Sequence, residues 1–221
     1  MIGGALRALL PAGVGLGLQP LDVPAPPLWP GEAEAVRRAV PARQREFAAG
    51  RAAARVALRD AGLPAASLPV GPDRAPLWPA GICGSISHGG TLAAALAARK
   101  SDWPSLGLDL EPALPLEEEL AGLVRAPGDD DGGVLPPALA AKLIFSAKEA
   151  AFKAQFPLTG LWLDYTEVAL RLAPQGFTLT LGRATLHGRW TLAEGLFATV
   201  LVIGAAEARA LPARTAQLPP V

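Results

Sequence analysis

The chain has 221 residues, of which 51% are hydrophobic, and its formal net charge at neutral pH is zero. This length and composition predict a globular protein with a sizeable core, organised as one large domain or two small ones. The neutral balance argues against a general nucleic-acid binder. The single cysteine, Cys83, excludes an internal disulfide framework and a multi-cysteine zinc site. No apolar run approaches the roughly 18 residues that a membrane span needs.

The first thirty residues are rich in proline and glycine, and they predict a strand near residues 13–18 followed by a loop. The GVGLG run lacks both the sixth-position glycine and a following helix, so it is not a dinucleotide-binding fingerprint. The N-terminal segment superficially resembles a signal peptide, but Pro11 and the glycines interrupt its apolar centre. We therefore expect a cytoplasmic protein without a cleaved signal.

Residues 32–62 show a helical pattern that Pro41 divides and that ends before Gly62. Seven arginines and one acid lie between Arg37 and Arg59, and such a segment either attracts an anion or exposes a solvated helix face. Charge alone favours the solvated face.

The segment GSISH, the pair Gly89-Gly90 and the run TLAAALAA follow a turn-rich stretch at residues 64–79. Alanine propensity alone would make the last run a helix. The apolar residues before the glycine pair also suit a β-hairpin, and we prefer the hairpin.

Residues 106–111, LGLDLE, predict a strand with its leucines on one face and Gly107, Asp109 and Glu111 on the other. The backbones of two residues two positions apart on a strand are separated by roughly 7 Å, so both carboxylates can lean onto one cation. The alternative for this segment alone is a strand edge with two solvated acids.

An acidic stretch at 114–133 follows, and its residues 127–133 predict a mobile loop. A helix is then expected from Pro136 or Pro137 to about Gln155, ending before Pro157. On it, Glu149 and Lys153 are four residues apart and share one face; taken alone they also suit a surface ion pair. Residues 177–186 and 195–204 predict closing strands, and 211–221 a loose tail.

Three motifs in this order, GSISH at 84–88, GLDLE at 107–111 and FSAKEAAFKA at 145–154, resemble the signature of the 4′-phosphopantetheinyl transferases. Segments 43–58 and 71–81 are similar to the branch that contains enterobactin synthetase component D. The resemblance implies an α+β fold of two similar halves related by a pseudo-twofold axis within one chain. We expect the N-terminal half at 1–103 and the C-terminal half at 104–221.

The resemblance also implies a reaction, the transfer of 4′-phosphopantetheine from coenzyme A to a serine of an apo acyl or peptidyl carrier protein. The second product is adenosine 3′,5′-bisphosphate, and Mg²⁺ is the implied cofactor. The implied metal ligands are Asp109, Glu111 and Glu149. Glu149 and Lys153 are the implied catalytic residues. The implied coenzyme A contacts are Arg43, Arg51, Arg74, Ser87, His88, Asp109 and Lys153.

By the same resemblance we expect a monomer that activates carrier proteins of secondary metabolism, such as siderophore synthesis. The neutral charge and the short apolar runs predict that it binds neither nucleic acid nor membrane. Two alternatives from other classes are a non-catalytic relative that binds coenzyme A or carrier, and a Mg²⁺-dependent hydrolase of nucleotide pyrophosphates. Phe145 stands where relatives often have tryptophan. Trp162 and Leu163 either line a channel for the pantetheine arm or pack in the core. We expect His187 on the surface and Cys83 in the core.

Overall fold

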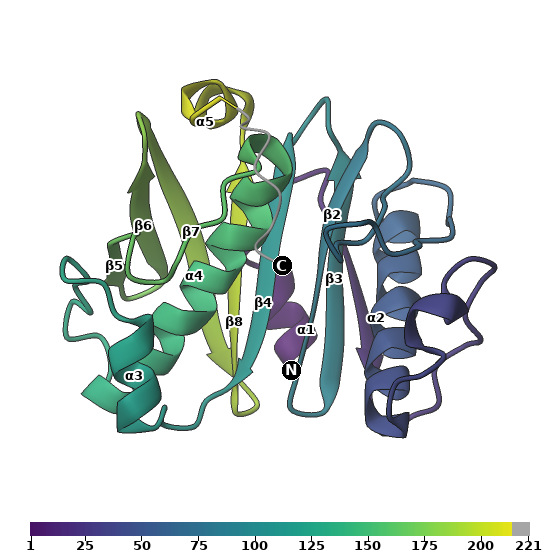
Figure 1. Ribbon diagram of the computed structural model, residues 1–221, viewed down its shortest axis with the longest axis horizontal. Helices are drawn as coiled ribbons and strands as arrows, with labels where there is room; N and C mark the ends of the chain where they lie inside the picture. The colour runs from purple at the N-terminus through teal and green to yellow at the C-terminus, as the bar shows by residue number, and fades with distance from the viewer. Residues whose placement is uncertain (214–221) are drawn as a thin grey trace.

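Two antiparallel sheets form the centre of the computed structural model, which describes residues 1–213 (Figure 1). The three-stranded sheet has the order β1-β3-β2, with bounds Gly15–Pro20, Leu92–Arg99 and Ile82–Gly89. The five-stranded sheet has the order β4-β8-β7-β6-β5, with bounds Ser105–Pro112, Leu196–Ile203, Ala184–Ala193, Gly176–Leu181 and Leu170–Ala173. The predicted α+β class is confirmed, and TLAAALAA is a strand of the β2–β3 hairpin, as expected.

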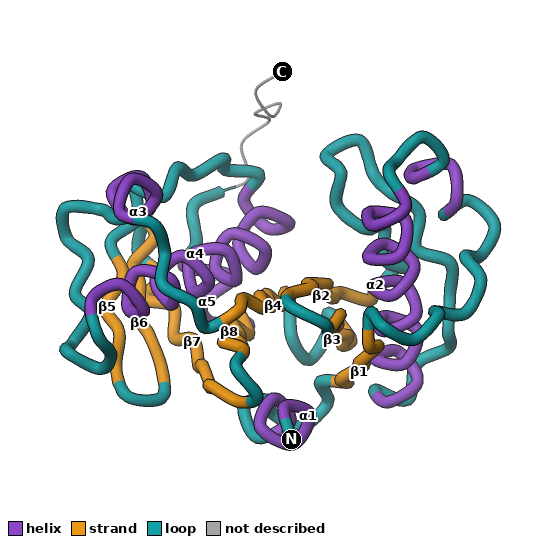
Figure 2. Tube along the Cα trace, turned by 90° about the horizontal axis from the view of Figure 1, so that it is seen from below, coloured by secondary structure: helices purple, strands orange, loops and turns teal. Residues whose placement is uncertain are grey.

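One long helix packs on each sheet: α2 (Pro41–Asp60) on the first and α4 (Pro137–Thr159) on the second. Figure 2 shows both helices on one side of the strands and the N-terminal helix on the other. The shorter helices are α1 (Ile2–Arg7), η1 (Ala33–Val36), α3 (Glu118–Val124) and α5 (Ala205–Ala210). None of the helices within residues 1–213 is long and apolar enough to cross a membrane.

Prolines begin both long helices, because the first helical position has no intrahelical use for an N–H group. The end predicted for α4 is wrong, since the helix continues past Pro157 to Thr159. Pro157 lies in the last turn, where its missing N–H removes a single hydrogen bond. Gly160 then ends the helix in the left-handed conformation, with φ of 67°. The predicted tail at 211–221 lies mostly outside the described residues.

Glycines in the strands let the two long helices approach their sheets closely. A Cβ atom on Gly17 of β1 would lie 1.9 Å from the Ala53 carbonyl oxygen of α2, and one on Gly107 of β4 would lie 1.8 Å from the Ala150 carbonyl oxygen of α4. Real Cβ atoms do not come so near, so only glycine allows these contacts. Gly15 and Gly17 of the GVGLG run therefore serve packing, and Gly107 sets the spacing between β4 and α4.

The two sheets meet along β2 and β4, where serine hydroxyls take the place of a backbone ladder. Ser85 Oγ accepts the Leu108 N–H at 3.0 Å, and Ser87 Oγ accepts the Leu110 N–H at 3.2 Å. The leucines of β4 are fully buried in a core that includes residues of both sheets. Asp109 points the other way, toward α4, as the period of two predicted.

The acidic stretch is more ordered than its composition predicts. Residues 118–124 form α3, and the Asp129 side chain is 1% exposed. Its carboxylate accepts the N–H groups of Ala126 and Leu170 and an ion pair from Lys148. Residues 127–133 form a loop without a helix or a named strand, as predicted, and Asp129 ties this loop to Ala126, Lys148 and Leu170.

Asp60, the last residue of α2, links this helix to the N-terminal segment. Its carboxylate accepts the Leu16 N–H at 2.8 Å and a hydrogen bond from Arg7, and both interactions lower its pKa. Because the folded-state pKa is the lower one, this stabilisation is fully present above the unfolded-state pKa. It is lost as the pH falls through the folded-state pKa.

We expect Asp60→Asn to lower the urea midpoint of unfolding near neutral pH, because the amide carries no charge for Arg7. The difference from the original chain should shrink as the pH falls below about 4, where the aspartate becomes protonated. Urea titrations of both proteins across this range measure the effect. A difference that stays constant down to the lowest pH would contradict the assignment.

Candidate active site

Asp109 is the centre of the polar contacts between β4 and α4. Its side chain is 5% exposed, and Lys153 Nζ and Ser87 Oγ donate to Oδ1 at 2.6 and 3.0 Å. Ser146 Oγ donates to Oδ2 at 2.9 Å. The carboxylate is thus held by three donors from β2 and α4, and a charged group is stable in this buried position.

The other two predicted metal ligands lie nearby, but each has a different partner. Glu111 on β4 accepts a hydrogen bond from Lys142 Nζ at 3.1 Å, and burial raises its pKa. Glu149 Oε2 lies 4.0 Å from Lys153 Nζ, and Glu149 Oε1 accepts a hydrogen bond from Tyr165. Within residues 1–213, no three histidine, cysteine or acidic side chains are close enough together to share a metal ion.

The donor set nevertheless fits a hard divalent cation. Carboxylate oxygens from a strand and a facing helix are ligands that Mg²⁺ accepts, together with water and phosphate oxygens. The ammonium of Lys153 lies between Asp109 Oδ1 and Glu149 Oε2, so a positive charge already bridges these two acids. The three carboxylates lie on β4 and α4 as expected, but they do not form a preformed three-carboxylate cluster, and the metal site stays a prediction.

A polar cavity of about 300 Å³ extends from this centre to α2. All seven residues expected to contact coenzyme A line it: Arg43, Arg51, Arg74, Ser87, His88, Asp109 and Lys153. They come from two helices, two strands and the turn at 71–76. Segments more than a hundred residues apart in sequence therefore form one cationic cavity, which has Asp109 and Lys153 in its lining.

The arginines and the histidine of this cavity are held in different ways. Arg51 is 5% exposed, donates from Nε to the Leu68 carbonyl at 2.7 Å and stacks on the Phe47 ring at 4.1 Å. Burial lowers its pKa to about 10, so it remains charged at neutral pH. Arg43 Nη1 lies 3.0 Å from His88 Nε2, and burial lowers the pKa of His88. His88 is therefore mostly neutral in the free protein at neutral pH.

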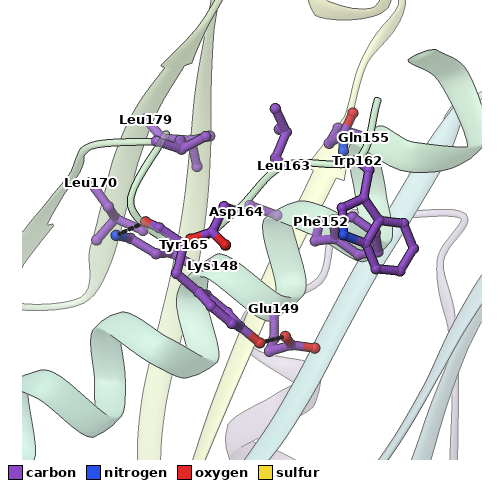
Figure 3. A pocket seen from close by; sticks show the side chains of 12 residues that line it. Lys148, Glu149, Phe152, Gln155, Trp162, Leu163, Asp164, Tyr165, Leu170 and Leu179 are labelled. Carbon is purple, nitrogen blue, oxygen red and sulfur yellow. Dashed lines mark hydrogen bonds between the residues drawn. The ribbon is translucent and has the colours of Figure 1, made fainter. Parts of the chain in front are cut away.

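A second cavity, of about 310 Å³ and mainly apolar, lies on the other side of Glu149 (Figure 3). Phe152, Trp162, Leu163 and Leu179 contribute to its walls, and Glu149 and Tyr165 lie at its polar side. The Trp162 ring packs edge-on against Phe152 and Phe156, yet 49% of the residue remains exposed. Trp162 is thus a cavity residue and not a core residue. Cys83 is buried and His187 is exposed, as predicted.

Lys142, Ser146 and Tyr165 belong to the site but were not predicted. Helical spacing could have indicated the first two. Lys142, Ser146, Glu149 and Lys153 follow spacings of four, three and four, which place them on one face of α4. The spacing therefore indicates that Lys142 and Ser146 are neighbours of Glu149 and Lys153. Tyr165 lies after the helix, and no periodicity connects it to Glu149.

Comparison with known proteins agrees with the motifs. Residues 31–98 match the family model described as the 4′-phosphopantetheinyl transferase N-terminal domain. The chain is 39% identical over 213 residues to 4′-phosphopantetheinyl transferase Svp of Streptomyces mobaraensis, covering 89% of this chain and 84% of the relative. It is 33% identical over 193 residues to 4′-phosphopantetheinyl transferase PptT of Mycobacterium tuberculosis, covering 79% and 85%.

A third relative is enterobactin synthase component D of Salmonella typhimurium, with 34% identity over 179 residues, covering 74% of this chain and 73% of the relative. These identities extend over most of each protein and beyond the three motifs. The chain belongs to the 4′-phosphopantetheinyl transferase family.

Proposed function

We propose that this protein transfers the 4′-phosphopantetheine group of coenzyme A to a serine of an apo acyl or peptidyl carrier protein. One observation carries the proposal: a single cavity contains the three predicted arginines, Ser87 and His88, and its lining includes Asp109 and Lys153. Such a cavity suits an anionic nucleotide whose reactive phosphate lies next to the carboxylates. The relatives, which the chain matches over 84% and 85% of their length, are named as enzymes of this family and support the proposal.

The arginines of the cavity suit the phosphate groups of coenzyme A, because a guanidinium can bind two phosphate oxygens at once. Arg51 is fixed by Leu68 and Phe47 before any ligand binds, so little side-chain entropy is lost at this position. Burial lowers the pKa of His88, and a bound phosphate beside it would favour its protonated, donating form.

Asp109, Glu111 and Glu149 are the residues that would hold Mg²⁺, which when bound supplies neutralising charge at the pyrophosphate. Lys153 would stabilise the charge that develops on the leaving phosphate as the P–O bridge breaks. Ser87 and Ser146 keep Asp109 oriented through their hydrogen bonds to its two oxygens.

Glu149 is the proposed base that accepts the proton of the carrier serine, directly or through a water molecule. It lies between the two cavities, near Lys153 on one side and at the edge of the apolar cavity on the other. The apolar cavity suits the pantetheine arm, which needs room and few charges. The phosphate between arm and nucleotide would then lie close to Glu149.

In this proposal residues 1–103 form the half that supplies the arginines, and residues 104–221 form the half that supplies the carboxylates. It also includes Mg²⁺ as the metal and a monomeric, cytoplasmic enzyme that serves carrier proteins of secondary metabolism. The relatives named for enterobactin synthesis suggest a siderophore pathway as one context.

The reaction is tested by following adenosine 3′,5′-bisphosphate by liquid chromatography, with coenzyme A and Mg²⁺ present and with or without apo carrier protein. A transferase forms this product only when apo carrier is present, in an amount equal to the carrier that is modified. Product formed at the same rate without carrier would instead show a hydrolase that passes phosphopantetheine to water.

Arg43→Ala is expected to weaken binding of coenzyme A about tenfold, because a charge-assisted hydrogen bond to phosphate is lost from a half-exposed site. Arg45→Ala is the matched control, since Arg45 is on the same helix, exposed and outside the cavity lining. Titration calorimetry with coenzyme A measures both affinities. Equal affinities for the two variants would contradict the placement of the nucleotide beside Arg43.

A further inference from the structure

Tyr165, the only tyrosine of the chain, lies beside Glu149 at the edge of the apolar cavity. Its hydroxyl donates a hydrogen bond to Glu149 Oε1, and Figure 3 shows the ring reaching from the segment after α4 back to the helix. This contact does not come from the α4 face that carries Lys142, Ser146, Glu149 and Lys153, because Tyr165 lies after the helix. The Tyr165 hydroxyl thus holds Oε1 of Glu149, the proposed base.

The position of the Tyr165 ring does not depend on Glu149. The Phe145 ring packs against it with a centroid distance of 5.5 Å, and the Tyr165 carbonyl accepts a hydrogen bond from Lys148 Nζ at 2.7 Å. Lys148 is itself held by Asp129 and by the Val124 carbonyl. The ring and the backbone of Tyr165 therefore have partners other than Glu149.

Glu149 needs such a donor, because its own surroundings restrict it little. The side chain is 26% exposed, and its contact with Lys153 is long, at 4.0 Å. With Oε1 held by Tyr165, Oε2 is directed to the side of Lys153 and Asp109. Loss of the hydroxyl would let the carboxylate rotate among several rotamers, of which only some face Asp109.

We propose that Tyr165 is a positioning residue that orients Glu149 Oε2 toward the reacting phosphate and the carrier serine. This inference rests on the proposed function only in the role given to Glu149. The effect of Tyr165→Phe should appear in the rate of transfer more than in the binding of coenzyme A, because phenylalanine keeps the ring that lines the apolar cavity and the residue lies outside the nucleotide cavity.

The first test is Tyr165→Phe, which removes one oxygen and keeps the ring. We expect kcat for carrier modification to fall about tenfold or more, with the KM for coenzyme A changed by less than about twofold. Thr166→Val is the matched control: it removes a hydroxyl from the next residue, which bonds Asp164 and not Glu149. An unchanged kcat in Tyr165→Phe, or an equal loss in Thr166→Val, would overturn the proposal.

The second test needs no activity. Protein labelled with ¹³C at the tyrosine ring carbon that bears the hydroxyl gives one signal, because Tyr165 is the only tyrosine. Glu149→Gln should shift this signal, since a neutral amide replaces the charged acceptor. Glu167→Gln, at an exposed acid two residues from Tyr165, should leave it in place.

These two measurements separate the inference from the proposed function. If the unaltered protein modifies no carrier but the signal still shifts in Glu149→Gln, the contact stands and the transferase assignment fails. If the carrier is modified but the signal is the same in both glutamine variants, the hydrogen bond is absent and Tyr165 does not position Glu149. If Tyr165→Phe does not fold, the signal of Tyr165 in the unaltered protein and in the two glutamine variants still tests the hydrogen bond.

Discussion

Glu149→Gln is expected to lower kcat for carrier modification by about 10²–10⁴-fold, the usual contribution of a general base. The substitution keeps the size of the side chain but leaves no group that can accept the proton of the serine. Glutamine still accepts a hydrogen bond from Tyr165, so the fold around α4 should persist. The effect is measured as the single-turnover rate of carrier modification.

Two controls make this result specific. Adenosine 3′,5′-bisphosphate, measured without Mg²⁺, should bind Glu149→Gln with an affinity within a few-fold of the original, because Glu149 is outside the lining of the nucleotide cavity. Glu118→Gln removes an exposed acid in the first turn of α3 and should leave the rate unchanged. A rate in Glu149→Gln within about threefold of the original would remove Glu149 from the role of base.

Asp129→Ala is expected to lower the free energy of unfolding by about 3–5 kcal/mol, because it leaves the Lys148 ammonium buried without its counter-charge. The two side chains are 1% and 4% exposed and 2.7 Å apart. Burial already lowers the pKa of Lys148, and Asp129 is the main group that opposes this shift. The N–H groups of Ala126 and Leu170 would lose their acceptor as well.

Urea unfolding measures this loss, and a double variant tests its cause. Asp129→Leu combined with Lys148→Met replaces the ion pair by apolar side chains, and should recover part of the stability lost in Asp129→Ala. Asp130→Ala is the control in the same segment, since Asp130 pairs with Arg171 at an exposed position. Equal stabilities for Asp129→Ala and Asp130→Ala would show that the buried pair does not hold this segment to α4.

Much of this structure follows from local patterns in the sequence. The period of two along residues 106–111 placed Asp109 opposite the leucines, and it does lie opposite them. The β2–β3 hairpin was also predictable from the glycine pair between apolar runs, although its turn lies at Gly90-Thr91, one residue later than the predicted Gly89-Gly90. The motifs then identified which of the many arginines belong to one cavity, which charge alone could not do.

What the sequence did not reveal depends on contacts between distant segments. Residues 127–133 form the predicted loop, but their acidic composition does not predict that the Asp129 side chain is buried by partners at positions 126, 148 and 170. Tyr165 reaches Glu149 only because the chain turns back after Gly160. The three carboxylates share a region, yet lysines neutralise Asp109 and Glu111, a pairing that the separate motifs do not encode.

The central claim is tested most directly by the intact mass of an apo carrier protein after incubation with this protein, coenzyme A and Mg²⁺. The account predicts a mass increase of one phosphopantetheine group, which disappears when EDTA removes the metal or when the acceptor serine of the carrier is replaced by alanine. An unchanged carrier mass across acyl and peptidyl carriers, despite measurable binding of coenzyme A, would contradict it and indicate a relative that binds without transfer.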